Sequence, residues 1–291
     1  MKKCVIIING FYTNPSIEHQ VSSISTELEN LGVKCSTVKS DSLFCYLESG
    51  ECKTHIDADF VVYLDKDVHS ARILEKCGLK LFNCAKAIEL CDDKMLTYLA
   101  LANNGIAMPK TISSPVMYKD TEDGDFVTRI ERVLDYPIVI KEVFGSMGFG
   151  VHLAENKIQL NELREKYKLK PHLYQQFVGK GGQDKRVILI GGKVVACMKR
   201  VNRTDFRSNI ERGGIGEVTT LTDSEREMAE KVASLLCLDY CGVDILTDLN
   251  GNPCLCEANS NAFFRGIQSV TGINVAKIYA EYIYNKIYGK Y

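Results

Sequence analysis

The stretch PIVIKEVFGSMGFG, from Pro137 to Gly150, decides how the chain is expected to fold. A short run of apolar, β-favouring residues leads to Lys141, and a turn containing three glycines follows after a spacer. Glycine allows backbone conformations in which successive N–H groups turn inward and cradle phosphate oxygens. Because Val151–Glu155 continues as a strand, the pattern predicts a hairpin whose flexible, glycine-rich flap covers a nucleotide. A plain hairpin with a mobile turn and a solvated lysine is the alternative.

Two familiar phosphate-binding motifs do not fit this turn. A Walker A loop would end in Gly-Lys-Ser or Gly-Lys-Thr, and neither tripeptide occurs in the sequence. A dinucleotide-binding fingerprint would open a helix, whereas the residues after Gly150 have the pattern of a strand. The turn therefore gives no support to a nicotinamide-dependent oxidoreductase.

Length and charge limit the classes of protein to consider. The chain has 291 residues, which predicts two or three domains, and its formal net charge is −1. Such a charge creates no overall field that favours nucleic acid or an anionic membrane, so we expect neither as a partner. The apolar run at the start breaks at Asn9, which makes it shorter than the roughly 7–15 residues of a signal-peptide core. No run approaches the roughly 20 apolar residues that span a bilayer, and we expect a cytoplasmic protein.

Twelve cysteines are scattered along the chain without any Cys-x-x-Cys pair. Structural zinc usually requires closely spaced ligands, so this spacing argues against a zinc site. Several cysteines, such as Cys4 and Cys254, lie within apolar segments, where a free thiol behaves as a small hydrophobic residue. We expect reduced core thiols, in keeping with a reducing cytosol.

Residues 1–93 alternate between strand and helix patterns, which predicts an α/β domain with a parallel sheet. Strands are expected at Lys3–Ile8, Val33–Val38 and Phe60–Leu64, and a helix at Ile17–Leu31. Ligands gather at the carboxyl ends of such strands, so we expect this domain to form one wall of a cleft.

Residues 94–172 are expected to form a central lobe, and residues 173–291 a carboxyl-terminal lobe. Asp92 or Asp93 can cap a helix that places Lys94 in its first turn, where the helix dipole does not favour a cation. Lys94 is therefore either a surface lysine or a cation that is required there to bind phosphate.

Two later segments also favour ligand binding. Leu173–Val178 alternates and then meets glycines, which suits a strand edge that reads the polar edge of a nucleotide base. Thr204–Gly214 carries arginines and side-chain amides without apolar periodicity, so it either handles oxyanions or is a solvated linker. Between them, Gly191-Gly192 predicts a tight hairpin. Asn274–Tyr288 has the spacing of a packing helix.

The stretch GVDILTDLNGNPCLCEAN, from Gly242 to Asn259, predicts a second hairpin because Asn-Gly is a strong signal for a two-residue turn. If this Asn-Gly pair forms the turn, Asp244 faces Glu257 directly and Asn259 lies on the same face. Facing carboxylates repel unless a cation lies between them or one is protonated. Two carboxylates and an amide oxygen suit Mg²⁺, which commonly takes phosphates and waters as its other ligands. A solvated sheet edge with three polar residues is the alternative.

Taken in order, the flap, the base-binding strand edge, the arginine-rich loop and the paired carboxylates resemble the ATP-grasp superfamily. The resemblance is strongest to RimK-type carboxylate–amine ligases, which include glutamate ligases and the ligase of lysine biosynthesis. It covers about residues 84–280 and rests on the motifs DDKMLTYLALANNGIAMPKT, YPIVIKEVFGSMGFGV, YQQFV, DFRSNIERGG, GVDIL and CEANSNAFFRGIQSVTGINVA. It implies an α+β ATP-grasp fold, in which two lobes clasp ATP, preceded by an α/β parallel-sheet domain.

Positions that match the family's motifs imply roles for individual side chains. Lys94 and Lys141 match the two phosphate-binding lysines, and Asp184 matches an acidic residue near the ribose. Relatives often have glutamate where Gln176 stands, so this side chain can contact adenine differently. The ATP-binding residues that the resemblance implies are Lys94, Lys141, Ser146, Gln176, Phe177, Val178, Asp184, Arg207, Ser208 and Asn209. The implied catalytic residues are Lys141, Arg200 and Arg207, and the implied metal ligands are Asp244, Glu257 and Asn259.

The resemblance further implies an enzyme in which a substrate carboxylate attacks the γ-phosphate of ATP and an amine captures the acyl phosphate. Cations suit its charged transition state, whose stabilisation is largely electrostatic. ATP and two Mg²⁺ ions are the expected cofactors, with Mn²⁺ as an alternative ion. A phosphoryl transferase and a non-catalytic nucleotide sensor are the alternatives. The expected partners are small-molecule or peptide carboxylates and amines, and self-association as a homo-oligomer stays open.

Asn261 and Arg265 follow the predicted metal hairpin directly, and we expect both to bind substrate. An arginine can grip a carboxylate with two parallel N–H bonds, so Arg265 is expected to bind a non-reacting carboxylate. Phe263 and Phe264 are expected to shield this place from water. A surface arginine that pairs with a nearby acid is the alternative. Glutamate, a peptide carboxyl terminus, an aminoadipate-like acid and a coenzyme carboxylate all stay open as the substrate.

Overall fold

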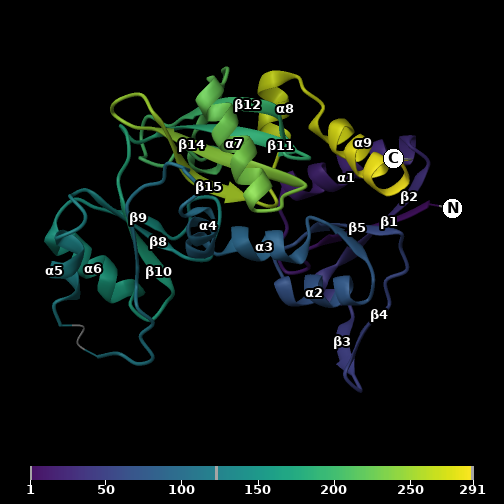
Figure 1. Ribbon diagram of the computed structural model, residues 1–291, viewed down its shortest axis with the longest axis horizontal. Helices are drawn as coiled ribbons and strands as arrows, with labels where there is room; N and C mark the ends of the chain where they lie inside the picture. Colours follow the sequence, from purple (N-terminus) through teal and green to yellow (C-terminus); the bar gives the residue numbers. More distant parts are fainter. Residues whose placement is uncertain (1, 122–123, 290–291) are drawn as a thin grey trace.

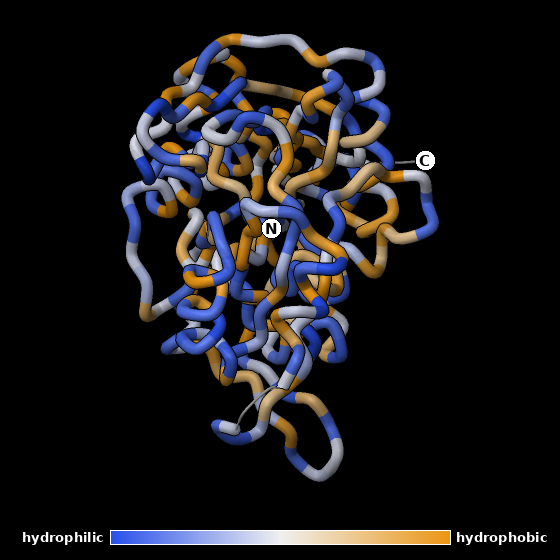
Figure 2. The backbone as a smooth tube through the Cα atoms, turned by 90° about the vertical axis from the view of Figure 1, so that its left-hand side faces the viewer, coloured by the Kyte–Doolittle hydropathy of each residue, from blue (hydrophilic) through white to orange (hydrophobic). Residues whose placement is uncertain are grey.

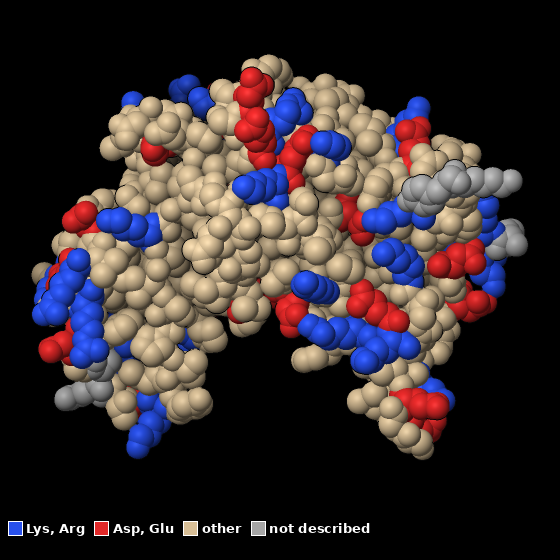
Figure 3. All heavy atoms as spheres, viewed as in Figure 1, with Lys and Arg blue, Asp and Glu red and all other residues tan. Residues whose placement is uncertain are grey.

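The computed structural model describes residues 2–121 and 124–289 of the chain. Three main sheets and a small hairpin organise this part (Figure 1). Hydrophobic and hydrophilic segments alternate along the backbone (Figure 2), as expected where each strand or helix buries one face. On the face drawn in Figure 3, acidic and basic side chains are interspersed. None of the described helices combines the length and the apolar character that crossing a membrane requires.

The first sheet is parallel, with its strands in the order β2-β1-β5-β6. These strands are β1 (Lys2–Ile8), β2 (Val33–Lys39), β5 (Phe60–Leu64) and β6 (Lys80–Phe82). The accompanying helices are α1 (Pro15–Asn30), α2 (Val68–Lys76) and α3 (Ala85–Asp92), and the small hairpin consists of β3 (Cys45–Glu48) and β4 (Glu51–Thr54). The predicted parallel sheet is confirmed, and each of the three predicted strands is found with ends that differ by at most one residue.

Helix α1 shows how the local sequence builds this layer. The Asn14 side chain caps the helix by accepting a hydrogen bond of 2.7 Å from the N–H of Ser16. Its buried face, which includes Ile24 and Leu28, packs in a core that also contains residues of the last helix, α9 (Val275–Tyr288). Gly32 then adopts a φ of +78°, which lets the chain reverse into β2.

The second sheet has the strand order β7-β10-β8-β9 and carries the glycine-rich flap. Its strands are β7 (Thr111–Ser113), β8 (Ile138–Glu142), β9 (Val151–Ala154) and β10 (His172–Gln176), and its helices are α5 (Phe126–Glu131) and α6 (Lys157–Tyr167). Before it, α4 (Lys94–Leu101) is capped by Asp93, which accepts from the N–H groups of Met95 and Leu96. The expected lobe boundary at 172/173 cuts through β10, whose hydrogen bonds to β7 and β8 place it in the second sheet.

The third sheet is antiparallel, with the strand order β13-β12-β11-β14-β15. Its strands are β11 (Gln183–Ile190), β12 (Lys193–Val201), β13 (Ile215–Val218), β14 (Tyr240–Thr247) and β15 (Pro253–Asn259). Helix α7 (Asp223–Leu235) packs on one face, over residues such as Val187 and Val243. On the opposite face, Ile188, Ile190 and Tyr240 pack in one core with residues of α8 (Arg265–Thr271) and α9. The same face carries charged side chains on β11, β12 and β14, namely Asp184, Arg186, Arg200 and Asp244.

Asn83 joins the first sheet to the third. Its Nδ2 donates to the carbonyl oxygens of Tyr240 and Ser260 at 2.7 Å each, and its Oδ1 accepts from the N–H groups of Asp239 and Tyr240. The side chain is buried, so every one of these bonds is shielded from water. The bonds fix the first sheet against the strand that carries Asp244.

All twelve cysteines are free, as predicted, although they are not all in the core. Four are buried, namely Cys4, Cys91, Cys241 and Cys254. Cys237 is exposed, and the others are partly buried. The expectation that the thiols lie in the core is therefore correct for these four cysteines only.

Candidate active site

Four charged side chains form a ladder across one face of the third sheet. The strand pairs place Asp184 opposite Arg200 and Arg186 opposite Asp244. Arg200 Nε donates to Asp184 at 2.7 Å, and Arg200 Nη2 lies 2.9 Å from Asp244. Arg186 donates to Asp244 from Nε and from Nη2, the latter at 2.7 Å. Two aspartates and two arginines thus alternate in what we call the charge ladder.

The charge ladder is buried, and the charged forms of Arg186, Arg200 and Asp244 stabilise one another. The side chains of Asp244 and Arg200 are 3% and 5% exposed. Burial by itself raises the pKa of Asp244, but Arg186 and Arg200 outweigh this effect and lower the pKa to about 2. Burial likewise opposes the charge on both arginines, and the aspartates beside them nevertheless raise the arginine pKa values. Of the two facing carboxylates of the sequence prediction, Asp244 therefore has cations beside it, and two arginines supply them.

Glu257 lies opposite Asp244 as predicted, but not because of the predicted turn. The loop closes with a backbone bond from Asp248 N to Asn252 O at 2.9 Å, so a two-residue Asn-Gly turn is wrong. This longer loop shifts the pairing by one residue, and a bulge at Cys256 shifts it back before Glu257. Asn259 lies beside Glu257, with its Nδ2 donating to Glu257 Oε1 at 2.9 Å.

Two buried lysines lie near Glu257. Lys94 is 8% exposed, and its Nζ donates to the carbonyl oxygen of Gly145 at 2.9 Å. Burial lowers the pKa of Lys94, and the Glu257 carboxylate opposes that shift. Lys141 is 7% exposed. Burial also opposes its charge, but Cys256, Tyr98 and Glu257 together raise its pKa. The alternatives of a surface Lys94 and a solvated Lys141 are therefore wrong.

The flap between β8 and β9 is held by the arginine-rich loop. Arg207 Nη1 donates to the carbonyl oxygens of Gly148 and Val151 at 3.1 Å each, while Nε and Nη2 bind Asp205 at 2.9 and 2.6 Å. Gly148 has a φ of +72°, and a Cβ there would lie 2.8 Å from Asn209 Oδ1. The positive φ favours glycine at this position, and a Cβ there would require the Asn209 amide to shift.

Beneath the flap is a first cavity of about 100 Å³, enclosed by the second and third sheets. The predicted residues that line it are Lys94, Lys141, Ser146, Gln176, Phe177, Val178, Asp184, Arg200, Arg207, Ser208, Asn209, Asp244 and Glu257. A second cavity of about 500 Å³ lies beside it, between the first and third sheets. The remaining predicted residues, Asn259, Asn261 and Arg265, line this second cavity. Every predicted site residue therefore lines one of the two neighbouring cavities.

Some side chains are placed differently from their predicted roles. Gln176 is exposed, and its Oε1 accepts a bond of 3.3 Å from the N–H of Lys110. The carboxylate of Asp184 accepts hydrogen bonds from Arg200, so it is not free to bind a ribose. Phe264 does not shield the substrate position, because it is 1% exposed and packs in the core against Tyr240. Phe263 does line the second cavity.

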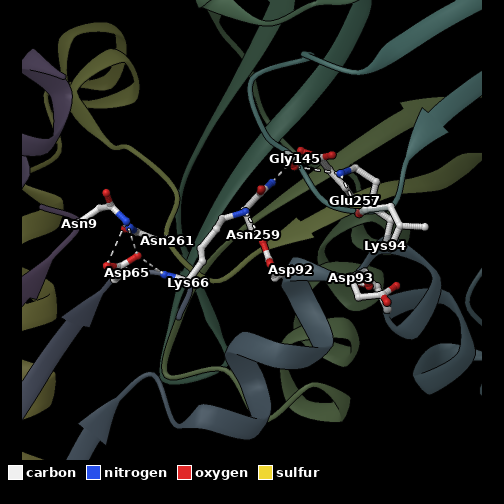
Figure 4. A network of polar contacts seen from close by, with 12 residues as sticks. Asn9, Asp65, Lys66, Asp92, Asp93, Lys94, Gly145, Glu257, Asn259 and Asn261 are labelled. Atoms are coloured by element: carbon white, nitrogen blue, oxygen red, sulfur yellow. Dashed lines mark hydrogen bonds and ion pairs between the residues drawn. The ribbon is translucent and has the colours of Figure 1, made fainter. Parts of the chain in front are cut away.

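The sequence alone missed Arg186, Asp65 and Lys66, whereas Asn9 lies in a loop at the end of a predicted strand, where a ligand is expected. Arg186 enters the ladder from a strand that pairs with β14, a contact between segments far apart in the sequence. Asn9, Asp65 and Lys66 belong to a polar network that continues toward Lys94 and Gly145 (Figure 4). The polar loop after β1 was a signal for Asn9, and the place of Asp65 directly after the predicted strand Phe60–Leu64 was a signal for Asp65.

Arg265 opens α8 and is exposed, with no ion pair among residues 2–121 and 124–289. The alternative in which it pairs with a nearby acid is therefore wrong for the part of the chain that is described. Its place on the wall of the second cavity leaves the guanidinium available to a ligand.

Comparisons with known proteins place this site in a family. A model of the RimK-like ATP-grasp domain matches residues 91–283. Beta-citrylglutamate synthase B of Homo sapiens is 36% identical over 225 residues, which are 76% of this chain and 57% of that protein. The probable alpha-L-glutamate ligase of Psychromonas ingrahamii is 38% identical over 219 residues, which are 73% of this chain and 70% of that protein. The chain thus spans a little more than half the length of the human relative.

A solved structure gives the same architecture. The ATP-grasp ligase PsnB, complexed with a minimal precursor, Mg and ADP, matches 98% of this chain and 98% of its own, with a TM-score of 0.70 and 16% identity. At that identity the likeness concerns the fold. It confirms the predicted α+β ATP-grasp fold, here preceded by a parallel sheet.

Proposed function

Because the chain belongs to the family of proteins with a RimK-like ATP-grasp domain, we propose that it is an ATP-dependent carboxylate–amine ligase. In the first step a carboxylate oxygen of the substrate attacks the γ-phosphorus of ATP, and the bond to the departing ADP breaks. In the second step an amine attacks the acyl carbon, phosphate leaves, and the nitrogen loses a proton. The products are an amide, ADP and phosphate.

The observation that carries this proposal is the contact between the two cavities. Ser146, Arg200, Asn209 and Glu257 line both of them. The first cavity offers the flap and two buried lysines, a setting that suits the phosphates of a nucleotide. The second cavity is larger and adjoins the same four residues. A phosphoryl group can therefore pass from a nucleotide in the first cavity to a carboxylate in the second.

The individual roles that we propose follow from charge and position. Lys94 and Lys141 bind phosphate oxygens, and a bound phosphate would offset the burial that lowers the pKa of Lys94. The backbone and side chains of Gln176, Phe177 and Val178 border the adenine, and Ser208 and Asn209 border the phosphates. Arg200 and Arg207 stabilise the charge that develops during transfer. Arg207 also ties the flap to the loop.

A divalent cation fits the side chains around Glu257. The described residues contain no group of three His, Cys, Asp or Glu side chains able to hold a metal by themselves. Glu257, Asn259 and Asp244 instead offer two carboxylates and an amide, a set that suits Mg²⁺ when nucleotide phosphates complete its ligands. Asp244 would share its oxygens with Arg186 and Arg200. We infer two Mg²⁺ ions, replaceable by Mn²⁺, which would neutralise phosphate charge.

For the substrates, we propose L-glutamate as the amine, since the names of both curated relatives contain glutamate. The carboxylate partner that we propose is a small acid or a peptide terminus. We place the protein in the cytoplasm, where ATP is available and free cysteines stay reduced.

Release of ADP distinguishes this proposal from its alternatives. The full chain is incubated with ATP, Mg²⁺ and pools of carboxylic acids and amino acids, together and separately. A ligase sustains ADP release only when a carboxylate and an amine are both available, which the amino-acid pool alone can also provide, and mass spectrometry identifies the amide. Sustained release without any amide product would indicate a phosphoryl transferase. Nucleotide binding without any release would indicate a sensor.

A further inference from the structure

Asp65 lies where the topology of the first sheet favours a ligand. Strand β1 has β2 on one side and β5 on the other, so the connections that follow β1 and β5 run in opposite directions. Ligands of open parallel sheets bind at the carboxyl ends of strands at such a point. Asn9 directly follows β1 and Asp65 directly follows β5. Both residues line the second cavity.

The contacts of Asp65 leave its charge without a cation. Asn9 Nδ2 lies 3.1 and 3.3 Å from its two carboxylate oxygens, and the N–H of Lys66 donates to Oδ1 at 2.7 Å. The Lys66 ammonium itself pairs with Asp92 at 2.7 Å. Asp65 is 6% exposed, and no ion pair joins it to any residue in the described ranges. The Asp65 carboxylate therefore receives hydrogen bonds from amide groups but contacts no cation, so a cationic ligand can bind to it without displacing an ion pair.

A second acceptor lies beside Asp65. Asn261 Nδ2 donates to the carbonyl oxygen of Leu64 at 2.7 Å, which leaves Asn261 Oδ1 as the other hydrogen-bonding atom of the amide. That oxygen is buried and has no hydrogen-bond partner in the described part of the chain. Asn9, Asp65 and Asn261 come together in Figure 4 from three separate segments. Two acceptors at one place call for a ligand that is a donor.

The same cavity carries one free group of the opposite sign. Among its cations, Arg186 and Arg200 pair with aspartates of the charge ladder, and Lys66 pairs with Asp92. Arg265 has no ion pair within the described ranges. Glu211 and Glu257 also line the cavity without an ion pair in the described ranges, but they come from other segments. The second cavity therefore offers one unpaired guanidinium at α8 and, at the first sheet, the unpaired carboxylate of Asp65. A zwitterion matches both.

We propose that Asp65, supported by Asn9 and Asn261, binds the ammonium group of an amino-acid substrate in the second cavity. This inference rests on the proposed function and specifies which residues read the amine. An ammonium group has three donors, which suit the free capacity of the Asp65 carboxylate and Asn261 Oδ1. Arg265 binds a carboxylate of the same molecule or of its partner substrate.

Calorimetric titration of the full chain, with Mg²⁺ and a non-hydrolysable ATP analogue, tests this role. The twenty protein amino acids are titrated first, and the tightest binder is then compared with its analogue lacking the amino group, for example glutarate for glutamate. The wild type should prefer the amino acid about tenfold or more, because a charge-assisted bond is lost in the analogue. Asp65→Asn should remove that preference while its KM for ATP stays unchanged.

Asp41→Asn provides the matched control. Asp41 follows β2 at the same edge of the first sheet but is exposed and lies outside the residues that line either cavity. This variant should keep the preference of the wild type. If Asp65→Asn does not fold, Asn261→Ala removes the second acceptor and should reduce the preference by a smaller factor.

Two results would overturn the inference. One is a full preference for the amino acid in Asp65→Asn, or in Asn261→Ala where that variant is used. The other is a wild type that binds none of the twenty amino acids. The ligase proposal is judged separately by ADP release with pooled acids and amines, so failure of one does not entail failure of the other.

Discussion

The floor and the flap of the first cavity are held in place by different kinds of interaction. The floor is the charge ladder, in which side chains of adjacent strands pair with one another and are shielded from water. The flap is mostly backbone, with glycines at its bends and with Phe144 and Phe149 53% and 59% exposed. It is held to the rest by hydrogen bonds from Lys94 and Arg207 to its carbonyl oxygens.

This difference indicates which part moves. The first cavity has a volume of about 100 Å³, whereas pockets for ligands of nucleotide size usually have roughly 300–1,000 Å³. Opening the floor would separate buried charges, at a cost of several kcal/mol. Releasing the flap breaks a few hydrogen bonds of about 1 kcal/mol each, which water can replace. Nucleotide entry should therefore lift the flap and leave the ladder intact.

The largest expected effect is on stability, in the floor. Asp244→Asn removes the charge shared by Arg186 and Arg200, and loss of a buried partner typically costs about 3–5 kcal/mol. The sequence alone predicts that this variant loses turnover with little loss of fold, whereas the ladder predicts a lower free energy of unfolding. Urea denaturation measures it. Glu257→Gln is the control, because Glu257 has no ion pair in the described ranges, and it should change stability by less than about 1 kcal/mol.

Acid gives an independent check of this prediction. The pKa of Asp244 is about 2, below the ordinary value of 3.8, so its stabilising effect is present above pH 3.8 and is lost as the pH falls toward 2. Asp244→Asn should lack that part of the acid dependence. Equal losses in Asp244→Asn and Glu257→Gln, or unchanged acid dependence, would show that the ladder does not stabilise the fold.

The second effect is on turnover. Glu257→Gln keeps the shape of the side chain and deletes the carboxylate that borders both cavities. If Glu257 is a ligand of Mg²⁺, the rate of ADP release at saturating ATP should fall by about 100-fold, and the Mg²⁺ concentration needed should rise. Turnover near that of the wild type at low Mg²⁺ would remove Glu257 from the metal site.

The same floor shows what could be read from the sequence. The parallel sheet, the flap and the facing of Asp244 and Glu257 depend on local patterns, and all were predicted. Asp244 and Glu257 still lie opposite each other only because a bulge at Cys256 compensates for the longer loop. A second bulge, at Val195 in β12, brings Asp184 opposite Arg200, where the Gly-Gly turn alone would place Lys199.

The charge ladder could not be predicted because its pairs depend on the positions of these two bulges. A one-residue shift moves every later side chain to the other face of a sheet, and neither bulge has a signature in the sequence. Arg186 adds a second difficulty, since β11 pairs with β14 across more than fifty residues of chain. The residues that line the two cavities could be identified by resemblance, but the partners of their charged side chains could not.

The third effect concerns the strand that leads into the flap. Lys141→Ala removes a buried cation from the first cavity, so the Kd for ATP should rise by about tenfold or more. Lys170→Ala is the control, because Lys170 is exposed and pairs with Glu142 outside both cavities. Equilibrium dialysis with labelled ATP measures both variants. Unchanged affinity in Lys141→Ala would exclude a direct contact with phosphate.

The flap itself should respond less strongly. Gly148→Ala places a Cβ 2.8 Å from Asn209 Oδ1, so either the flap or the Asn209 amide, which we place beside the phosphates, must shift, and affinity for ATP should fall several-fold. Gly192→Ala is a matched control, with a φ of +75° against +72° and nothing within 4 Å of the new Cβ. Both variants should lose about 1–2 kcal/mol of stability from the left-handed backbone, but only Gly148→Ala should lose affinity. Equal affinities would show that the contact with Asn209 does not hold the flap.

The smallest expected effect lies outside both floor and flap, at Arg265. This residue is exposed at the start of α8 and faces the second cavity, so it does not support the nucleotide. Arg265→Lys keeps the charge but loses the paired N–H donors that match a carboxylate, and the KM for the acidic substrate should rise about three- to tenfold. The KM for ATP and the free energy of unfolding should stay unchanged, since no described residue forms an ion pair with Arg265. Steady-state kinetics with each substrate varied in turn measures this. A change in the KM for ATP alone would move Arg265 to the phosphate site, and no change in either KM would leave it a surface residue.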